Sequence, residues 1–288
     1  MAENKPAAPA AKPASASHGT KSSGNLISWI APIGCLILGY CVWRFSMGAE
    51  ANFGEPDKSG GFWPQHRKPI GSWAGIYEGG IIIPILIGMF FMVWCFAIER
   101  FLTIIKASGK GNAGDFVRKV QYHLANKDVD KAIAECDKQS GSVGNVMKSG
   151  LRKYKEMITD SELTTEQKVL AIQKSVEEAT ALELPMLEKN LVFLSTITSL
   201  ATLVALLGTV MGMIRAFAKL GDESGGSAAA GELAVGISEA LYNTAFGIGT
   251  SALAMFFYNV FTTRIDGITH GIDESGFTLT QSFASLYK

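Results

Sequence analysis

The sequence predicts an all-α membrane protein with four transmembrane helices and an aqueous helical domain. Of its 288 residues, 48% are apolar and 18% are charged, and the mean hydropathy of +0.20 is high for a soluble protein. The charges are unevenly placed, because long windows contain none while the segment 99–187 holds 14 of the 26 Lys and Arg residues. Asp and Glu also total 26, so the chain has no net basic charge and the composition gives nucleic-acid binding no support.

Four apolar windows are long enough to cross a bilayer core, which takes about 20 residues in a helix. Four windows of this length argue against buried helices of a soluble protein. We expect the first window to be an uncleaved helix. A polar, Ala/Pro/Ser-rich stretch of about twenty residues precedes it, and its apolar run exceeds the ~7–15 residues of a signal-peptide core. The uncharged windows are Ser22–Trp43, Gly79–Ile98 and Asn190–Ile214, and a fourth, Leu233–Thr263, contains one ionisable residue, Glu239.

The distribution of Lys and Arg predicts the topology. The tail before the first window holds three Lys and one Glu, and the long segment after the second window is the richest in Lys and Arg. Both therefore belong on the cytoplasmic side. The predicted division is a disordered tail over 1–25, transmembrane helices over 26–43, 76–98, 188–215 and 233–263, outer loops over 44–75 and 216–232, a cytoplasmic helical domain over 99–187 and a cytoplasmic C-terminal segment over 264–288.

Helical periodicity and glycine breaks predict the structure of the cytoplasmic domain. Ala113–Lys138 and Val143–Ile158 are expected to form two amphipathic helices. Thr164, followed three residues later by Gln167, is typical of a capping box at a helix start.

The same reasoning predicts long helices that leave the membrane. After Thr164 the sequence has one strong helix breaker, Pro185, before the apolar stretch ends near Lys219. We therefore expect one helix of about 50 residues, roughly 75 Å long. The last window is likewise expected to continue into 264–288, so that membrane helices project inward as a stalk.

Glu239 is the candidate for chemistry inside the membrane. A carboxylate in a spanning segment is costly and marks function by default. The competing interpretation is that Glu239 lies near the outer interface and pairs with Arg or Lys. The other polar groups of the last two windows are hydroxyls, most of which are expected to bond to a carbonyl one turn earlier. Small residues recur every four positions, a spacing that permits close helix packing.

The sequence offers no basis for an enzyme. The four Cys and four His residues are scattered, so neither a disulfide framework nor a metal site is expected. No Ser/His/Asp set, phosphate-binding loop or carboxylate pair is visible. A membrane path lined by hydroxyls lacks a deep titratable group, and the composition therefore suggests that a partner chain supplies one.

Three segments resemble the MotA/TolQ/ExbB proton-channel family. The stretch GGIIIPIL from Gly79, leading to Glu99-Arg100, resembles the first common helix. The stretch LLGTVMGMI over 206–214 is similar to the family's most specific signature, and ISEALYNTAFG over 237–247 resembles the third common helix. The three motifs in this order are much more specific than any one, and within the family they point to the ExbB subgroup.

The resemblance implies a pentamer in the bacterial inner membrane, with the N-terminus cytoplasmic and the outer loops periplasmic. Two ExbD-like single-helix subunits would fill the central pore, and protons would be the coupling ion, with no other cofactor. A TonB-like protein would receive the work for outer-membrane transport. The implied residue roles are pore hydroxyls for Thr209 and Thr244, proton entry for Glu239, the cytoplasmic membrane boundary for Glu99 and Arg100, and close packing for Gly208, Gly212 and Gly247.

Two positions depart from the family pattern. The family often has Pro where this chain has Thr202 and Leu253, which puts the associated kinks in doubt and lets Thr202 extend the hydroxyl row. The helix 26–43 also lies outside the common core. TolQ-like and flagellar or gliding stator subunits share these motifs, so those roles stay open, as do sodium coupling and a non-conducting membrane scaffold.

Overall fold

The computed structural model describes residues 23–54, 70–222 and 227–287, and the regular elements within these ranges are all helices. Four of the helices are long and apolar enough to cross a membrane. The predicted all-α membrane fold is therefore confirmed. Most of the predicted tail 1–25, the middle of the predicted loop 44–75 and the tip of the loop 216–232 lie outside the described residues.

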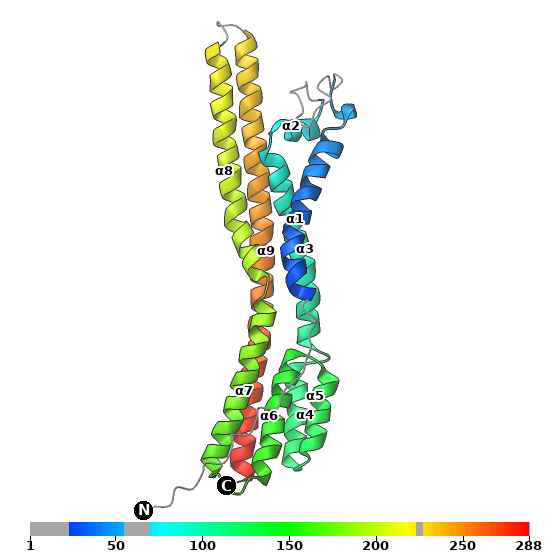
Figure 1. Cartoon of the computed structure of the whole chain (residues 1–288), viewed down its shortest axis with the longest axis vertical. Coiled ribbons are helices and arrows are strands. Elements are labelled where there is room, and N and C mark those ends of the chain that lie inside the picture. The colour runs from blue at the N-terminus through cyan, green and yellow to red at the C-terminus, as the bar shows by residue number, and fades with distance from the viewer. Residues whose placement is uncertain (1–22, 55–69, 223–226, 288) are drawn as a thin grey trace, which may run out of the picture.

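The upper half of the molecule, which we call the membrane half, contains two helix pairs (Figure 1). Helix α8 (Leu191–Asp222) packs antiparallel on the first half of α9 (Ser227–Leu286), and α1 (Ser23–Cys41) packs on α3 (Ile82–Ser108). At 60 residues, α9 is about 90 Å long and runs into the lower half. The predicted extension of the last window into 264–288 is confirmed.

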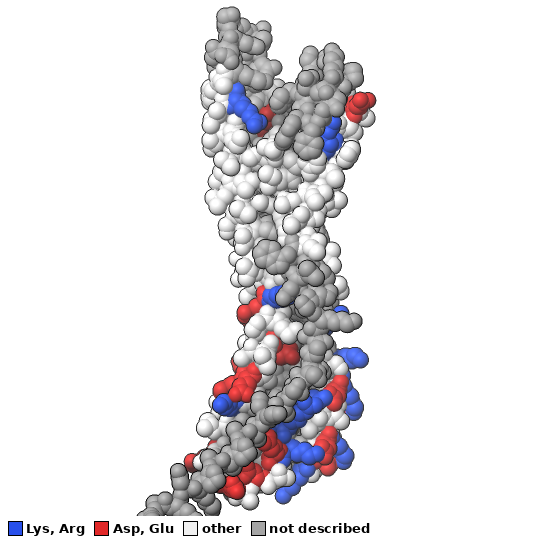
Figure 2. Space-filling view, viewed as in Figure 1, with Lys and Arg blue, Asp and Glu red and all other residues white. Residues whose placement is uncertain are grey.

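The lower half is a helical domain packed around the C-terminal part of α9 (Figure 1). One continuous apolar cluster joins it to the membrane half and includes the buried Tyr154, Leu279 and Phe283. On the face shown in Figure 2, charged side chains gather over this domain, and the membrane half is largely uncharged except near its upper end. The helices of this domain are α4 (Ala113–Ala125), α5 (Val129–Gln139), α6 (Ser142–Thr159) and α7 (Thr165–Glu188).

Two predicted helices are each divided in the structure. The expectation of one helix over Ala113–Lys138 is wrong, because Lys127 adopts a left-handed φ of 59° and separates α4 from α5. The N–H of Lys127 donates to the Leu124 carbonyl at 2.9 Å, which closes the end of α4. The run Asn126-Lys127-Asp128 is a polar turn that the helical periodicity did not reveal.

The expected 50-residue helix is also wrong, because it breaks between α7 and α8. Asn190 has a left-handed φ of 68°, which asparagine adopts more readily than most residues. Pro185 lies one turn before the break and has no N–H to continue the hydrogen-bond pattern. The predicted capping box at the start of α7 is confirmed, with Thr164 and Gln167 bonded reciprocally.

Glycines allow a close contact between α1 and α3, and aromatic rings pack together in the segment that follows α1. A Cβ on Gly39 would lie 2.5 Å from the Gly88 nitrogen, so the two backbones touch directly. After α1 the chain continues in a π-helix (Val42–Met47) and a 3-10 helix (Glu50–Asn52). The short α2 (Ser72–Glu78) follows the undescribed stretch, and its Tyr77 ring stacks on Trp43 with 4.7 Å between ring centroids.

Candidate functional site

The α8–α9 interface is closely packed because glycines and alanines face one another across it. A Cβ on Gly212 would lie 3.0 Å from the Ala240 Cβ, and one on Gly247 would lie 2.9 Å from the Ala201 carbonyl oxygen. Gly208 is similarly crowded by Ile82 of α3, at 3.0 Å. The structure therefore places all three predicted packing glycines in close contacts between helices, where a Cβ would press against atoms of the neighbouring helix.

This close approach brings Thr209 and Thr244 together, one from each helix. Their hydroxyl oxygens are hydrogen-bonded to each other. Each hydroxyl also lies near a backbone carbonyl, since Thr209 Oγ1 is 3.1 Å from the Ala205 oxygen and Thr244 Oγ1 is 3.3 Å from the Ala240 oxygen. The two residues are 35 positions apart in sequence, and the fold makes them neighbours. Their role as pore hydroxyls stays a prediction.

The hydroxyl pair can respond to either protonation state of a nearby carboxyl group. A hydroxyl has one hydrogen to donate and two lone pairs to accept with. When one threonine turns its hydrogen to a carbonyl, its oxygen can accept from a protonated acid. When the hydrogen turns outward, it can donate to a carboxylate. Both side chains are half-buried, and Thr209 lines one end of an open hollow of about 650 Å³ along α8, with Val210, Met213, Ile214, Phe217 and Ala218 as the other lining residues.

Thr202 lies seven residues before Thr209, which returns it to nearly the same side of α8 about 10 Å along the helix axis. Its hydroxyl donates to the Thr198 carbonyl at 3.4 Å. Ser251 of α9 donates to the same Thr198 oxygen. Hydroxyls therefore mark two levels of the α8–α9 interface, and Thr202 belongs to the lower one.

Glu239 is half-buried on α9 and forms an interaction with the surrounding structure. It precedes Thr244 by five residues, which places the two side chains about 140° apart around the helix. Glu239 is instead one turn from Asn243, on the same side of α9. The structure therefore does not align Glu239 directly with the threonine pair.

Glu99 and Arg100 lie at the break between α7 and α8. The Arg100 side chain is 3% exposed, and its Nη1 donates to the carbonyls of Leu187 at 3.2 Å and Met186 at 3.4 Å. These are free carbonyls of the last turn of α7. Glu99 pairs with Arg100. The Glu99 carboxylate also accepts from the Nδ2 of Asn190, at 3.2 Å. The pair thus fixes the point where the chain turns from the lower domain into the membrane half.

Two asparagines of these networks were missed by the sequence predictions. Asn190 is the first residue of an apolar window in the sequence, but asparagine in the left-handed conformation can also end a helix. Asn243 stands inside the third motif, but only the fold shows that it is buried against α3 and α8. Its Nδ2 donates to the Gly79 carbonyl at 3.2 Å, at the turn before α3.

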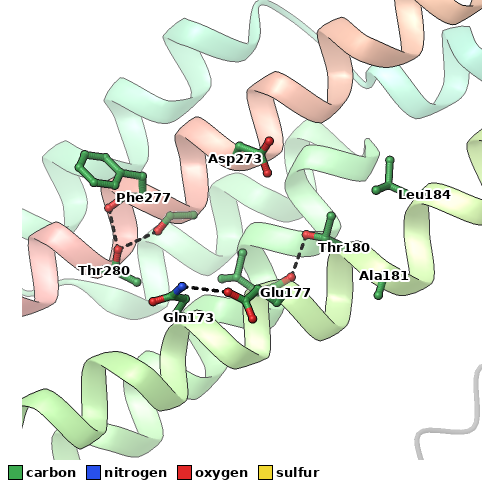
Figure 3. A pocket seen from close by; sticks show the side chains of 10 residues that line it. Gln173, Glu177, Thr180, Ala181, Leu184, Asp273, Phe277 and Thr280 are labelled. Carbon is green, nitrogen blue, oxygen red and sulfur yellow. Dashed lines mark hydrogen bonds between the residues drawn. The ribbon is translucent and has the colours of Figure 1, made fainter.

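A separate groove of about 470 Å³ lies between α7 and the C-terminal part of α9 in the lower domain (Figure 3). Glu177 and Asp273 stand at its edges on opposite helices, and Gln173 donates to Glu177 at 2.8 Å. Apolar atoms of Val176, Leu184 and Phe277 complete the lining. None of the residues predicted from the sequence lies in this groove, so it does not belong to the candidate pathway.

A comparison with known families matches residues 138–274 to the MotA/TolQ/ExbB proton channel family. The match contains the hydroxyl pair and the three packing glycines. This segment, a little under half of the chain, is therefore a MotA/TolQ/ExbB family domain. The match to a proton-channel family and the four helices long enough to cross a membrane together support a multi-pass membrane protein.

Relatives within this family carry both ExbB and TolQ names. The chain is 26% identical over 181 residues to a biopolymer transport protein ExbB of Xanthomonas campestris pv. campestris, covering 60% of the chain and 64% of the relative. It is 26% identical over 198 residues to the Tol-Pal system protein TolQ of Haemophilus influenzae, covering 65% and 81%. A putative ExbB-like protein of Synechocystis sp. is 37% identical over 87 residues, covering 30% of the chain and 41% of that relative. The chain thus spans less than two thirds of the length of these two ExbB-named relatives.

Proposed function

We propose that this chain forms the pore of an ExbB-like, proton-driven motor in the bacterial inner membrane. In this proposal five copies enclose two ExbD-like single-helix subunits. Proton flow through the complex performs work on a TonB-like protein, which energises outer-membrane transport. The observation that carries the proposal is the Thr209–Thr244 hydroxyl pair, whose Thr209 lines the apolar hollow along α8.

The chemistry of the pair supports an exchange of protons with a partner's carboxyl group. A fixed positive charge at this position would hold the carboxylate ionised, whereas hydroxyls bind both its charged and its neutral form. The hollow is lined mainly by apolar side chains, which suits contact with a membrane helix. A partner helix lying there would place one acidic residue beside Thr209 without a counter-charge to trap its proton.

A TolQ-like role is the second candidate, because the TolQ of Haemophilus influenzae is matched over 81% of its length. The two roles use the same hydroxyl pair and differ in the protein that receives the work. Deletion of the gene separates them: an ExbB-like role predicts loss of energised uptake with normal cell division, and a TolQ-like role predicts defects in envelope constriction.

The direct test is proton uptake by liposomes that contain the complex purified with its partner subunits. Thr209→Val and Thr244→Val should each abolish uptake while the partner subunits are retained, because valine keeps the shape of threonine without its hydroxyl. Thr196→Val is the matched control, since Thr196 is exposed on the same helix α8 and its hydroxyl donates to the Val192 carbonyl.

Uptake at the wild-type rate in both pore variants would contradict the assignment of the pair. Uptake that requires sodium in the buffer would contradict proton coupling, but the assignment of Thr209 and Thr244 to the pore would stand. A complex that takes up no protons in its wild-type form, with partners bound, would favour the non-conducting scaffold.

A further inference from the structure

Asn243 occupies a buried polar site that the hydroxyl pair does not explain. The residue is 2% exposed and lies on α9, in the membrane half. Its Nδ2 donates to the Gly79 carbonyl. Its Oδ1 is buried and accepts no hydrogen bond from the residues that the structure describes. A buried amide oxygen without a donor is unfavourable, and more so within a membrane, where lipid offers none.

Glycines let the neighbouring segments approach this amide closely. A Cβ on Gly79 would lie 3.0 Å from the Asn243 Oδ1, and one on Gly208 would lie 3.1 Å from its Nδ2. The turn before α3, helix α8 and helix α9 therefore meet at one polar side chain. The Asn243 Nδ2 donates its hydrogen to the Gly79 carbonyl. If Nδ2 and Oδ1 exchanged places, the Asn243 oxygen would face the Gly79 carbonyl oxygen with no hydrogen between them. The orientation with Oδ1 unbonded is the better one.

The missing donor must be small. Asn243 is enclosed within its own subunit, so neither a partner helix nor a lipid headgroup reaches Oδ1. A water molecule is the donor that fits an enclosed polar site, where buried waters typically bond to groups left unsatisfied by the protein. The Gly79 carbonyl has a second lone pair with which it can accept from the same water.

The position of the site connects it to the proposed pathway. Glu239 is one turn before Asn243 on the same side of α9, and Thr244 is the next residue along the chain. Around α9, Asn243 therefore lies between Glu239 and Thr244, which are otherwise on different sides of the helix.

We propose that Asn243 binds a buried water molecule through Oδ1 and is a further residue of the proton pathway, between Glu239 and the threonine pair. This inference rests on the proposed function for its role in proton transfer. The water site itself does not depend on it.

Synchrotron hydroxyl-radical footprinting tests the site in the full-length complex, because radicals form from bound waters and oxidise the side chains beside them. Ile83 is fully buried. A Cβ on Gly79 would lie 2.7 Å from the Ile83 Cγ1 and 3.0 Å from the Asn243 Oδ1, so Ile83 is a neighbour of the proposed water site. Leu194 is equally buried in α8 and serves as the reference. We expect oxidation of Ile83 well above that of Leu194, and its loss in Asn243→Leu. Equal, low oxidation of both residues in the wild-type complex would overturn the proposal, even if the variant fails to assemble.

Proton uptake then tests the role of the site. Asn243→Leu should lose uptake while keeping its partners, and Asn243→Ser should retain uptake, because serine leaves room for water and a group to bind it. Equal loss in both variants would assign Asn243 to anchoring Gly79 only, and unchanged uptake in both would remove it from the pathway. A wild-type rate in Thr209→Val together with oxidised Ile83 would overturn the proposed pore and leave the water site standing.

Discussion

Single residues in this protein act through neighbours that only the fold supplies. Thr209 becomes an adaptable donor and acceptor because Thr244 is bonded to it from the next helix. The cost of burying Arg100 is offset because one carboxylate and two free carbonyls accept hydrogen bonds from its guanidinium group. In each case the residue type is visible in the sequence, whereas the partner that gives it a role is distant in the chain.

Cys136 provides a prediction at this scale. It is buried between α5 and α6, and burial raises the pKa of its thiol to about 12. The thiolate is the reactive form, so Cys136 should resist alkylation by iodoacetamide at pH 8 in the native complex. It should react fully after unfolding. Peptide mass spectrometry gives both values, and fast native labelling of Cys136 would contradict the packing of this domain.

The same pKa shift sets the sign of a pH effect on stability. The unfolded thiol loses its proton near pH 8.5, whereas the folded thiol keeps it until about pH 12. The contribution of Cys136 to the free energy of unfolding is therefore complete below about pH 8.5 and falls as pH rises toward 12. Cys136→Ala should flatten this alkaline decline, as measured by denaturant unfolding between pH 8 and 11.

At the scale of elements, the break between α7 and α8 depends on one backbone conformation. Asn190 has a positive φ, which costs most residues about 1–2 kcal/mol and costs glycine nothing. Both Asn190→Gly and Asn190→Ala remove the hydrogen bond to Glu99, so we expect the glycine variant to be the more stable of the two in thermal unfolding of the complex. Equal stability of the two variants would show that the backbone at Asn190 carries no strain.

Arg100 of α3 is expected to stabilise the same break through its hydrogen bonds to the end of α7. Arg100→Met keeps a long side chain but leaves the Met186 and Leu187 carbonyls without their donor and Glu99 without its pair. The variant should be destabilised by about 3 kcal/mol or more. Arg118→Met is the matched control, because the Arg118 side chain is 82% exposed and pairs only with the exposed Asp115. Equal unfolding midpoints for the two variants would contradict the role of Arg100.

The packing of α8 on α9 gives a second matched pair of variants. A Cβ on Gly247 would meet Ala205 and the Ala201 carbonyl, whereas one on Gly249 has no atom within 4 Å. Alanine is favoured over glycine in a helix by about 1 kcal/mol. Gly249→Ala should therefore be neutral or stabilising, and Gly247→Ala should destabilise the complex in detergent by about 1–3 kcal/mol through overpacking. A stable Gly247→Ala complex would show that the helices separate freely at this point.

Local signals predicted most of the elements, and contacts between distant segments decided the rest. The apolar windows and the Thr164 capping box are properties of a few neighbouring residues, so the spans and the start of α7 could be predicted. The turns at Lys127 and Asn190 could not, because helical periodicity continues across both. For the site, the motifs identified Thr209 and Thr244, but the unbonded oxygen of Asn243 exists only where three segments meet.

At the scale of the whole molecule, α9 connects the two environments. Its first half carries Thr244 within the apolar membrane half, and its second half forms the centre of the charged lower domain (Figures 1 and 2). The helix is continuous over 60 residues and so connects the level of Thr244 to the lower domain without a break. This connection supports the proposed function, in which proton flow beside Thr244 moves a larger assembly.

The central claim is that the chain works as one member of a ring that encloses single-helix partners. Native mass spectrometry of the complex, purified in mild detergent from its own host, tests it most directly. We predict five copies of the chain together with two copies of a small protein whose single membrane helix contains an Asp. A monomer or dimer without such a partner, found consistently in several detergents, would contradict the account and reduce the Thr209–Thr244 pair to helix packing.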